Sequence, residues 1–202
     1  MKSITLHARL WAALGLALLL SACASKPIAM DGLLYAAPKV NPDASGRSSP
    51  VVVKLFHLKS LATFQAADFF SLYERPAEAL GSELVAVEEI ALVPGMQQRL
   101  ERPIAPEARY LALIAAFRDI ENSQWRGTLD VSQGDKVLPL IVEVSDRQVT
   151  LRKADGSGEL TKLEAKLKEK GEEAVKSAAD DAAQAAKDKA KQSLMKRLKR
   201  TP

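Results

Sequence analysis

The side chains that most enzymes use for catalysis are scarce in this sequence. His57 is the only histidine after residue 22, so a serine, histidine and aspartate arrangement would have to use it. No serine stands in the Gly-x-Ser-x-Gly pattern that places a nucleophile on a sharp turn. Glu88 and Glu89 are adjacent, and on a strand their carboxylates point to opposite faces, which prevents them from acting as a pair. We therefore predict no catalytic residue and no enzyme activity.

Metal and phosphate chemistry is not indicated either. The chain has a single cysteine and no cluster of histidines and cysteines with zinc spacing, and its glycines do not form a phosphate-binding loop. Hydrophobic residues make up 47% and charged residues 27% of the chain, which is typical of a globular protein. The formal net charge of +4 is modest. We predict no metal, no non-covalent cofactor and no nucleic-acid partner.

Cys23 is the residue whose surroundings do point to chemistry. A basic segment and an apolar run, residues 10–20, precede it, and the small residues Ser21 and Ala22 stand directly before it. This order is typical of a signal peptide cleaved in front of Cys23. The run is too short to cross a bilayer, which takes about 20 apolar residues. Because an unpaired thiol is a liability in an oxidising compartment, we expect Cys23 to carry S-diacylglycerol and an N-acyl chain.

Acyl chains on Cys23 would hold the protein on a membrane, since each buried methylene contributes about 0.8 kcal/mol. Ala24 follows the cysteine in place of aspartate, which by analogy with bacterial lipoprotein signals indicates export to the outer membrane. We therefore predict a signal peptide at residues 1–22, a lipidated tether at 23–27, and a domain that is held at a membrane surface by its contact with outer-membrane lipid. The alternative is an ordinary secretory signal with an incidental cysteine.

Residues 28–153 show the pattern of a β-sandwich. Apolar and alternating stretches recur about every ten residues, which predicts seven or eight short strands. Between residues 60 and 73 the apolar spacing changes and predicts a short helical insertion after the second strand. The expected strands are residues 28–37, 51–58, 85–93, 96–102, 111–117, 125–131, 137–144 and 148–153. The fold class is mainly β.

The first two predicted strands are joined by a long polar segment that contains prolines, a glycine and short polar side chains. These residues favour turns over regular structure. Long exposed loops are often functional, which makes this loop the first candidate for a binding surface. Its residues are Asn41, Pro42, Asp43, Ala44, Ser45, Gly46, Arg47, Ser48, Ser49 and Pro50.

Residues 154–202 form an extension of different composition. Alanine, lysine, glutamate and aspartate dominate it, and these residues tolerate or favour helix. Leu160, Leu163 and Leu167 share one face, but this apolar stripe is too short for firm packing. We expect a projecting helix that frays near Gly171, or a disordered extension. We interpret the basic residues 196–200 as solvated, with contact to anionic lipid headgroups as the alternative.

Several stretches of the sequence resemble those of one known family. They are residues 40–53, 55–59, 64–73, 106–111, 116–119 and 125–126, in this order. They are similar to the TssJ family, also called VasD or SciN, the lipoprotein of the type VI secretion membrane complex. The resemblance covers about residues 32–151. It implies a transthyretin-like β-sandwich with an added helical region.

The resemblance also implies a structural, non-catalytic role. Members of that family are anchored in the outer membrane, face the periplasm and bind the periplasmic C-terminal part of TssM, an inner-membrane protein. TssL belongs to the same complex, and we expect its contact to be indirect. The loop between the first two strands makes the TssM contact in that family, which corresponds to residues 41–50 here.

The extension after Lys153 departs from the family pattern. Two alternatives remain open for the function. A lipid-anchored periplasmic domain that binds a small ligand would need a sizeable apolar pocket. A surface-bound hydrolase would depend on His57.

Overall fold

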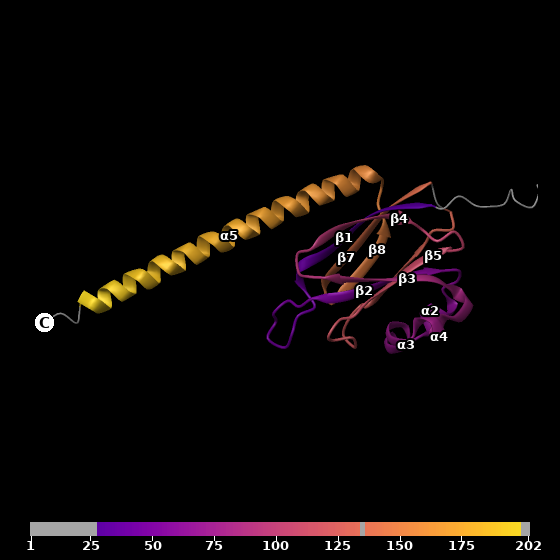
Figure 1. The fold of residues 1–202 in the computed structure, drawn as a ribbon, viewed down its shortest axis with the longest axis horizontal. Helices are drawn as coiled ribbons and strands as arrows, with labels where there is room; N and C mark the ends of the chain where they lie inside the picture. The colour runs from indigo at the N-terminus through magenta and orange to yellow at the C-terminus, as the bar shows by residue number, and fades with distance from the viewer. Residues whose placement is uncertain (1–27, 134–135, 199–202) are drawn as a thin grey trace, which may run out of the picture.

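The computed structural model describes residues 28–133 and 136–198. Eight strands form two four-stranded sheets that pack face to face as a β-sandwich, which confirms the predicted fold class (Figure 1). The strands are β1 Ala29–Val40, β2 Val51–Leu58, β3 Leu84–Leu92, β4 Gln97–Pro103, β5 Tyr110–Ala115, β6 Arg126–Asp130, β7 Val137–Asp146 and β8 Gln148–Lys153. Residues 1–27, which include the predicted signal peptide and Cys23, lie outside the described part of the chain.

The strand order is β4-β1-β7-β8 in the first sheet and β3-β2-β5-β6 in the second. β1 and β7 are parallel neighbours, so the chain leaves both strands at the same end of the sandwich. Antiparallel pairing of β2 with β5 brings the start of β2 and the end of β5 to this end as well. We call it the loop end, because residues 41–50 lie there. The opposite end, where the described chain begins at Ile28, is the entry end.

Alternation along the strands divides the apolar residues between the inner and outer faces of the sheets. In β2, Val53 and Leu55 point into the core between the sheets, whereas Phe56 and Leu58 belong to a second apolar cluster on the outer face. β5 divides its side chains in the same way. Its run of apolar residues is buried on both faces, between the core on one side and the second cluster on the other.

Three short helices and a 3-10 turn cover the outer face of the second sheet. They are α2 Ala62–Ala66, α3 Phe69–Glu74, α4 Pro76–Leu80 and η2 Gly81–Glu83. Phe64, Phe69, Leu72 and Leu80 from these helices pack on the apolar outer face of β2 and β5. Asp68 caps α3, because its carboxylate accepts a hydrogen bond from the Ser71 amide at 3.0 Å. The helical insertion predicted after the second strand is confirmed.

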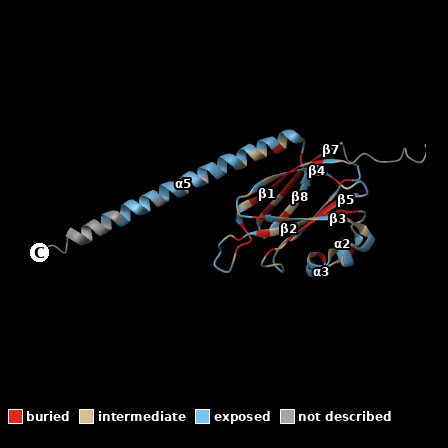
Figure 2. Ribbon diagram, in the orientation of Figure 1, coloured by how far each residue is buried: buried red, intermediate tan, exposed pale blue. Residues whose placement is uncertain are grey.

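The long helix α5, Ser157–Leu198, covers part of the outer face of the first sheet and then projects from the sandwich (Figure 1). Its 42 residues span about 63 Å at about 1.5 Å per residue. Leu160 is fully buried against Leu33 of β1 and Ile141 of β7. From residue 168 to residue 191, the helix residues whose burial is described are exposed (Figure 2).

The expected projecting helix is present (Figure 1), whereas two finer expectations for this extension are not met. We expected too few apolar residues for firm packing, yet Leu160 is buried, and Leu163 and Leu167 pack beside it. The outer face of β1 and β7 is itself apolar, so burying it stabilises the contact with α5. Three leucines are therefore enough to dock the first turns of the helix. We also expected fraying near Gly171, but α5 continues through it. No helix in the described residues is both long and apolar enough to span a bilayer.

Candidate functional site

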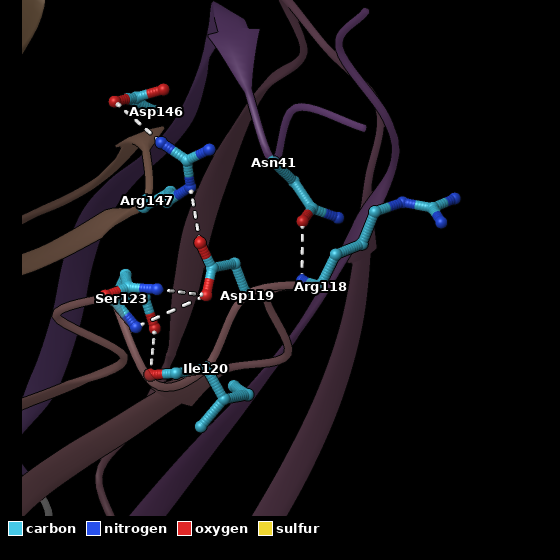
Figure 3. Close-up of polar contacts among 8 residues, drawn as sticks. Asn41, Arg118, Asp119, Ile120, Ser123, Asp146 and Arg147 are labelled. Carbon is cyan, nitrogen blue, oxygen red and sulfur yellow. Dashed lines mark hydrogen bonds and ion pairs between the residues drawn. The ribbon is translucent and has the colours of Figure 1, made fainter. Parts of the chain in front are cut away.

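The loop at residues 41–50 is fixed at its base by Asn41. Its side-chain amide donates to the Pro50 carbonyl at 2.7 Å and its side-chain oxygen accepts from the Arg118 amide at 2.8 Å (Figure 3). Its own backbone amide donates to the Asp146 carbonyl at 2.7 Å. Asn41 has φ +47°, in the left-handed region that asparagine tolerates better than most residues. Asn41 thus links its own loop, the segment after β5 and the β7–β8 turn at the loop end.

Asp43 organises the exposed part of the loop. One carboxylate oxygen accepts hydrogen bonds from the amides of Ser45 and Arg47, both at 2.9 Å, and the other pairs with the Arg47 guanidinium at 2.9 Å. The Arg47 amide, above all, lowers the pKa of Asp43, because it stabilises the charged carboxylate. Gly46, at φ +77°, closes the turn with a hydrogen bond from its amide to the Asp43 carbonyl. The loop is therefore ordered before any partner arrives.

These contacts change the interpretation of the predicted binding residues. Asn41, Pro42 and Ser49 are buried, so they support the loop and offer little surface to a partner. The exposed residues are Pro50 and an apex at 44–47, which we call the loop apex. Asp43 and Arg47 pair with each other, so their opposite charges largely cancel within the loop. The Arg47 side chain nevertheless remains 80% exposed.

A second segment, residues 116–125, lies beside the loop at the same end. Asp119 holds this segment in place: its carboxylate pairs with Arg147 in the β7–β8 turn at 3.3 Å and accepts from the side-chain amide of Asn122 at 2.9 Å (Figure 3). The side chain of Arg118 is exposed and points away from Asn41 in Figure 3. The loop end therefore includes two braced segments, each with an exposed arginine.

Sequence reasoning missed this second segment as part of the site. Arg118 and Asp119 entered only through their resemblance to family sequences. Their hydrogen bonds connect residues 77 positions apart, Asn41 and Arg118, and residues on separate turns, Asp119 and Arg147. No local spacing signals such contacts.

His57 is a buried structural residue and is not part of a catalytic arrangement. It lies in β2 and is buried. Its Nδ1 accepts a hydrogen bond from the Ala105 amide at 3.1 Å, which leaves the proton of the neutral ring on Nε2, 3.4 Å from Glu88 Oε1. Burial lowers the pKa of His57 more than the neighbouring Glu88 raises it. Glu88 in turn contacts Arg102 of β4, which ties the two sheets together along one side.

This arrangement gives no support to the alternative functions. Glu88 and Glu89 face opposite sides of β3, where Glu88 meets His57 and Glu89 meets Lys54 at 3.3 Å. Within the described residues, no group of three or more histidine, cysteine, aspartate and glutamate side chains could hold a metal ion. The core side chains between the sheets are at most 8% exposed. A hollow of about 570 Å³ at the entry end is lined by charged as well as apolar residues, such as Glu107, Arg109 and Ile104.

Comparison with known proteins finds matches to this chain both by sequence and by structure. A family model described as type VI secretion lipoprotein, VasD, EvfM, TssJ, VC_A0113 matches residues 29–153. No curated protein matches the chain. The crystal structure of the T6SS lipoprotein TssJ1 from Pseudomonas aeruginosa is similar, with 32% identity and a TM-score of 0.62, over 65% of this chain and 99% of the other.

Two further solved structures share the fold. A chain of the "Type VI membrane complex" is 25% identical with a TM-score of 0.57, and the match covers 63% of this chain and 99% of that one. A chain from the structure titled "T6SS protein TssM C-terminal domain (869-1107) from EAEC" is 24% identical with a TM-score of 0.53, over 62% and 98% of the two chains. At that identity the likeness shows the fold alone.

Proposed function

Because this chain belongs to the family of type VI secretion lipoproteins that includes TssJ and VasD, we propose that it anchors the periplasmic C-terminal part of TssM to the outer membrane. The family is structural and non-catalytic, so the work of this protein is to hold partners in place. The loop apex at residues 44–47 is the proposed contact. TssL belongs to the same complex and is held indirectly.

The observation that carries the proposal is the placement of the two ends of the sandwich. The described chain starts at the entry end, and β1 then runs 12 residues, about 40 Å, to the loop (Figure 1). A lipid on Cys23 is separated from Ile28 by at most about 18 Å of extended chain. The membrane would therefore lie beside the entry end, and the loop apex would face away from it into the periplasm.

The order of the loop also supports this role. Asp43 holds the apex in one conformation through two backbone amides and Arg47. A loop that is already ordered loses less conformational entropy when it docks, which strengthens binding without further contacts. The Arg47 guanidinium pairs with Asp43 through Nε and Nη2, so Nη1 of this exposed side chain is the donor left for a partner.

The proposal is tested by the affinity of the protein for the periplasmic C-terminal part of TssM from the same genome. Replacing the apex, residues 44–47, with glycine and serine at equal length should abolish detectable binding and leave the circular dichroism spectrum unchanged. A matched control carries Ser132→Gly and Gln133→Gly, two exposed positions at the entry end, and should bind normally. Full affinity of the apex variant would contradict the assignment of the loop.

The lipid anchor needs a separate test. Cys23→Ser should yield a folded protein that takes up no labelled palmitate, does not sediment with outer membranes and does not support secretion. Uptake of palmitate by this variant would contradict the proposed anchor.

A further inference from the structure

Four aromatic rings gather on the outer face of the second sheet, close to the loop end. Phe69 lies at the centre, with its ring centroid 5.4 Å from those of Phe70, Tyr73 and Trp125. It stacks on Tyr73 and meets the other two rings edge to face. We call these residues the aromatic cluster. Its rings come from α3 and from the end of segment 116–125, so it joins two parts of the chain.

Phe70 stands out within the aromatic cluster. Phe69 is 7% exposed and seals the apolar layer beneath α3, whereas Phe70 is 62% exposed. Phe70 adds little to the folded core and leaves a large apolar surface in water, which is the kind of patch that marks an interaction surface when other aromatic rings adjoin it.

A cation borders the aromatic cluster. The Arg126 guanidinium lies 4.2 Å from the Trp125 ring centroid. Its Nη1 donates to the Gln65 carbonyl at 2.8 Å, which fixes the position of the side chain. Within the described residues, Nη2 and Nε of Arg126 make no hydrogen bond or ion pair, and the residue is exposed. These two nitrogens can take a carboxylate in the paired geometry that arginine favours.

The aromatic cluster is continuous with the proposed TssM contact. Segment 116–125 starts beside the loop, where Asn41 accepts a hydrogen bond from the Arg118 amide. It ends at Trp125, whose ring touches Phe69. Figure 1 shows this segment between the loop at residues 41–50 and helix α3. A partner that reaches the loop apex can therefore extend across Arg118 onto Phe70 without crossing the sandwich.

We propose that the aromatic cluster is a second contact for TssM, which takes a large apolar side chain of TssM on Phe70 and Trp125 and a neighbouring carboxylate on Arg126. This inference rests on the proposed function and extends its binding surface. Aromatic residues and arginine dominate the energetic centres of protein interfaces, where they combine a large apolar area with fixed hydrogen bonds. The lipid bilayer is not the occupant, because the lipidated tether attaches at the opposite end.

The test compares the affinity of mature lipidated variants, extracted in detergent, for the periplasmic C-terminal part of TssM. Phe70→Ser should weaken binding about tenfold or more, the effect of losing an interface centre. Arg126→Lys keeps the charge but loses the forked geometry, and should weaken binding several-fold. Val137→Ser removes a comparable exposed apolar side chain, 45% exposed, at the entry end. It should leave the affinity unchanged.

The outcomes separate this inference from the proposed function. Wild-type affinity in both Phe70→Ser and Arg126→Lys, together with loss of binding in the apex variant, would overturn the second contact and leave the proposed function intact. Equal weakening by Val137→Ser would overturn it too, because the effect would not be local. If the unmodified protein does not bind TssM at all, the proposed function itself fails. Thermal unfolding of each variant shows whether Phe70→Ser has kept its fold.

Discussion

Asn41 holds the loop end together at the scale of single residues. Its side-chain amide donates a hydrogen bond to the Pro50 carbonyl, and its side-chain oxygen accepts one from the Arg118 amide. The Asn41 side chain that makes both bonds is buried. A buried polar group left without a partner costs about 1–3 kcal/mol. The positive φ of Asn41 adds a further demand, since a residue with an ordinary Cβ is strained there. Asn41 is therefore the residue on which the shape of the loop depends.

Two substitutions separate these effects. Asn41→Ala should lower the free energy of unfolding by about 2–4 kcal/mol, because it leaves the Arg118 amide and the Pro50 carbonyl unpaired and removes the polar side chain that lets asparagine tolerate the left-handed region. Asn41→Gly loses the same hydrogen bonds but relieves the strain, so it should cost about 1 kcal/mol less. Urea unfolding measures both. Equal stability of all three proteins would show that Asn41 does not brace the loop.

His57 makes the stability depend on pH. Burial lowers the pKa of His57 in the folded protein below its value of about 6.5 in the unfolded chain. The unfolded state thus binds more protons once the pH falls below about 6.5, and protonation favours unfolding. Glu88 opposes this shift and Arg102 adds to it, but burial dominates. The stabilising contribution is complete above pH 6.5 and is lost as the pH falls through the folded pKa.

We therefore expect the free energy of unfolding to decrease between about pH 7 and pH 5. The control is His57→Gln, which cannot titrate and should show a flatter profile in the same range. Urea unfolding at half-unit pH intervals gives both profiles. Parallel profiles for the two proteins would exclude His57 as the source.

The sequence identified the loop correctly as an irregular exposed connection, but it could not rank the residues within it. Proline, glycine and short polar residues mark a turn-rich segment whether their side chains point out or in. Asn41 and Ser49 are polar, yet they are buried because distant parts of the chain supply their partners. The ion pair of Asp43 and Arg47 spans only four residues and was within reach of local reasoning.

At the scale of elements, each sheet buries one face in the core and has helices over the other. α2, α3 and α4 cover the second sheet, and the first turns of α5 cover part of the first. The dock of α5 is small, with Leu160 at its centre and Arg99 of β4 3.8 Å from Glu164 at its rim. Such a dock holds the start of the helix, while the helix residues described from 168 to 191 are exposed.

Leu160→Ala should therefore undock α5 without unfolding the sandwich. Truncating a buried leucine costs about 2–5 kcal/mol, and here that loss falls on one small contact. Hydrogen exchange should become faster at the amides of residues 157–170 and stay unchanged in β2 and β5. The control is Val175→Ala on the same helix, where the side chain is 71% exposed, and it should change neither region. Faster exchange throughout the core strands would contradict a local dock.

Strand positions could be predicted because alternation of apolar residues directly reflects burial on one or two faces. β2 and β8 have the bounds that the pattern indicated, and the polar residues of β4 fit its place at a sheet edge. β1 runs to Val40, past the predicted end at Ala37, because its pairing with β7 shifts register between Ala36 and Val40 and accommodates Pro38 there. The parallel pairing of β1 with β7 has no local signal, since it joins strands about a hundred residues apart.

At the scale of the whole molecule, the sandwich has two ends to which we assign different roles. The chain enters at one end, where the proposed tether to Cys23 attaches. The loop apex, Arg118 and the aromatic cluster lie at or near the other. Helix α5 starts near the entry end and extends past the loop end (Figure 1). This polarity allows one domain to be fixed to a membrane and to present its binding surface to a protein that comes from the opposite side.

The most direct test of this polarity is site-specific photo-crosslinking in cells that assemble the secretion complex. A photoreactive amino acid at Ser45 of the loop apex should form an adduct with TssM. The same amino acid at Gln133, exposed at the entry end, should form none. Adducts with TssM from Gln133 and none from Ser45 would contradict the account, because TssM would then contact the end of the sandwich that we place beside the membrane.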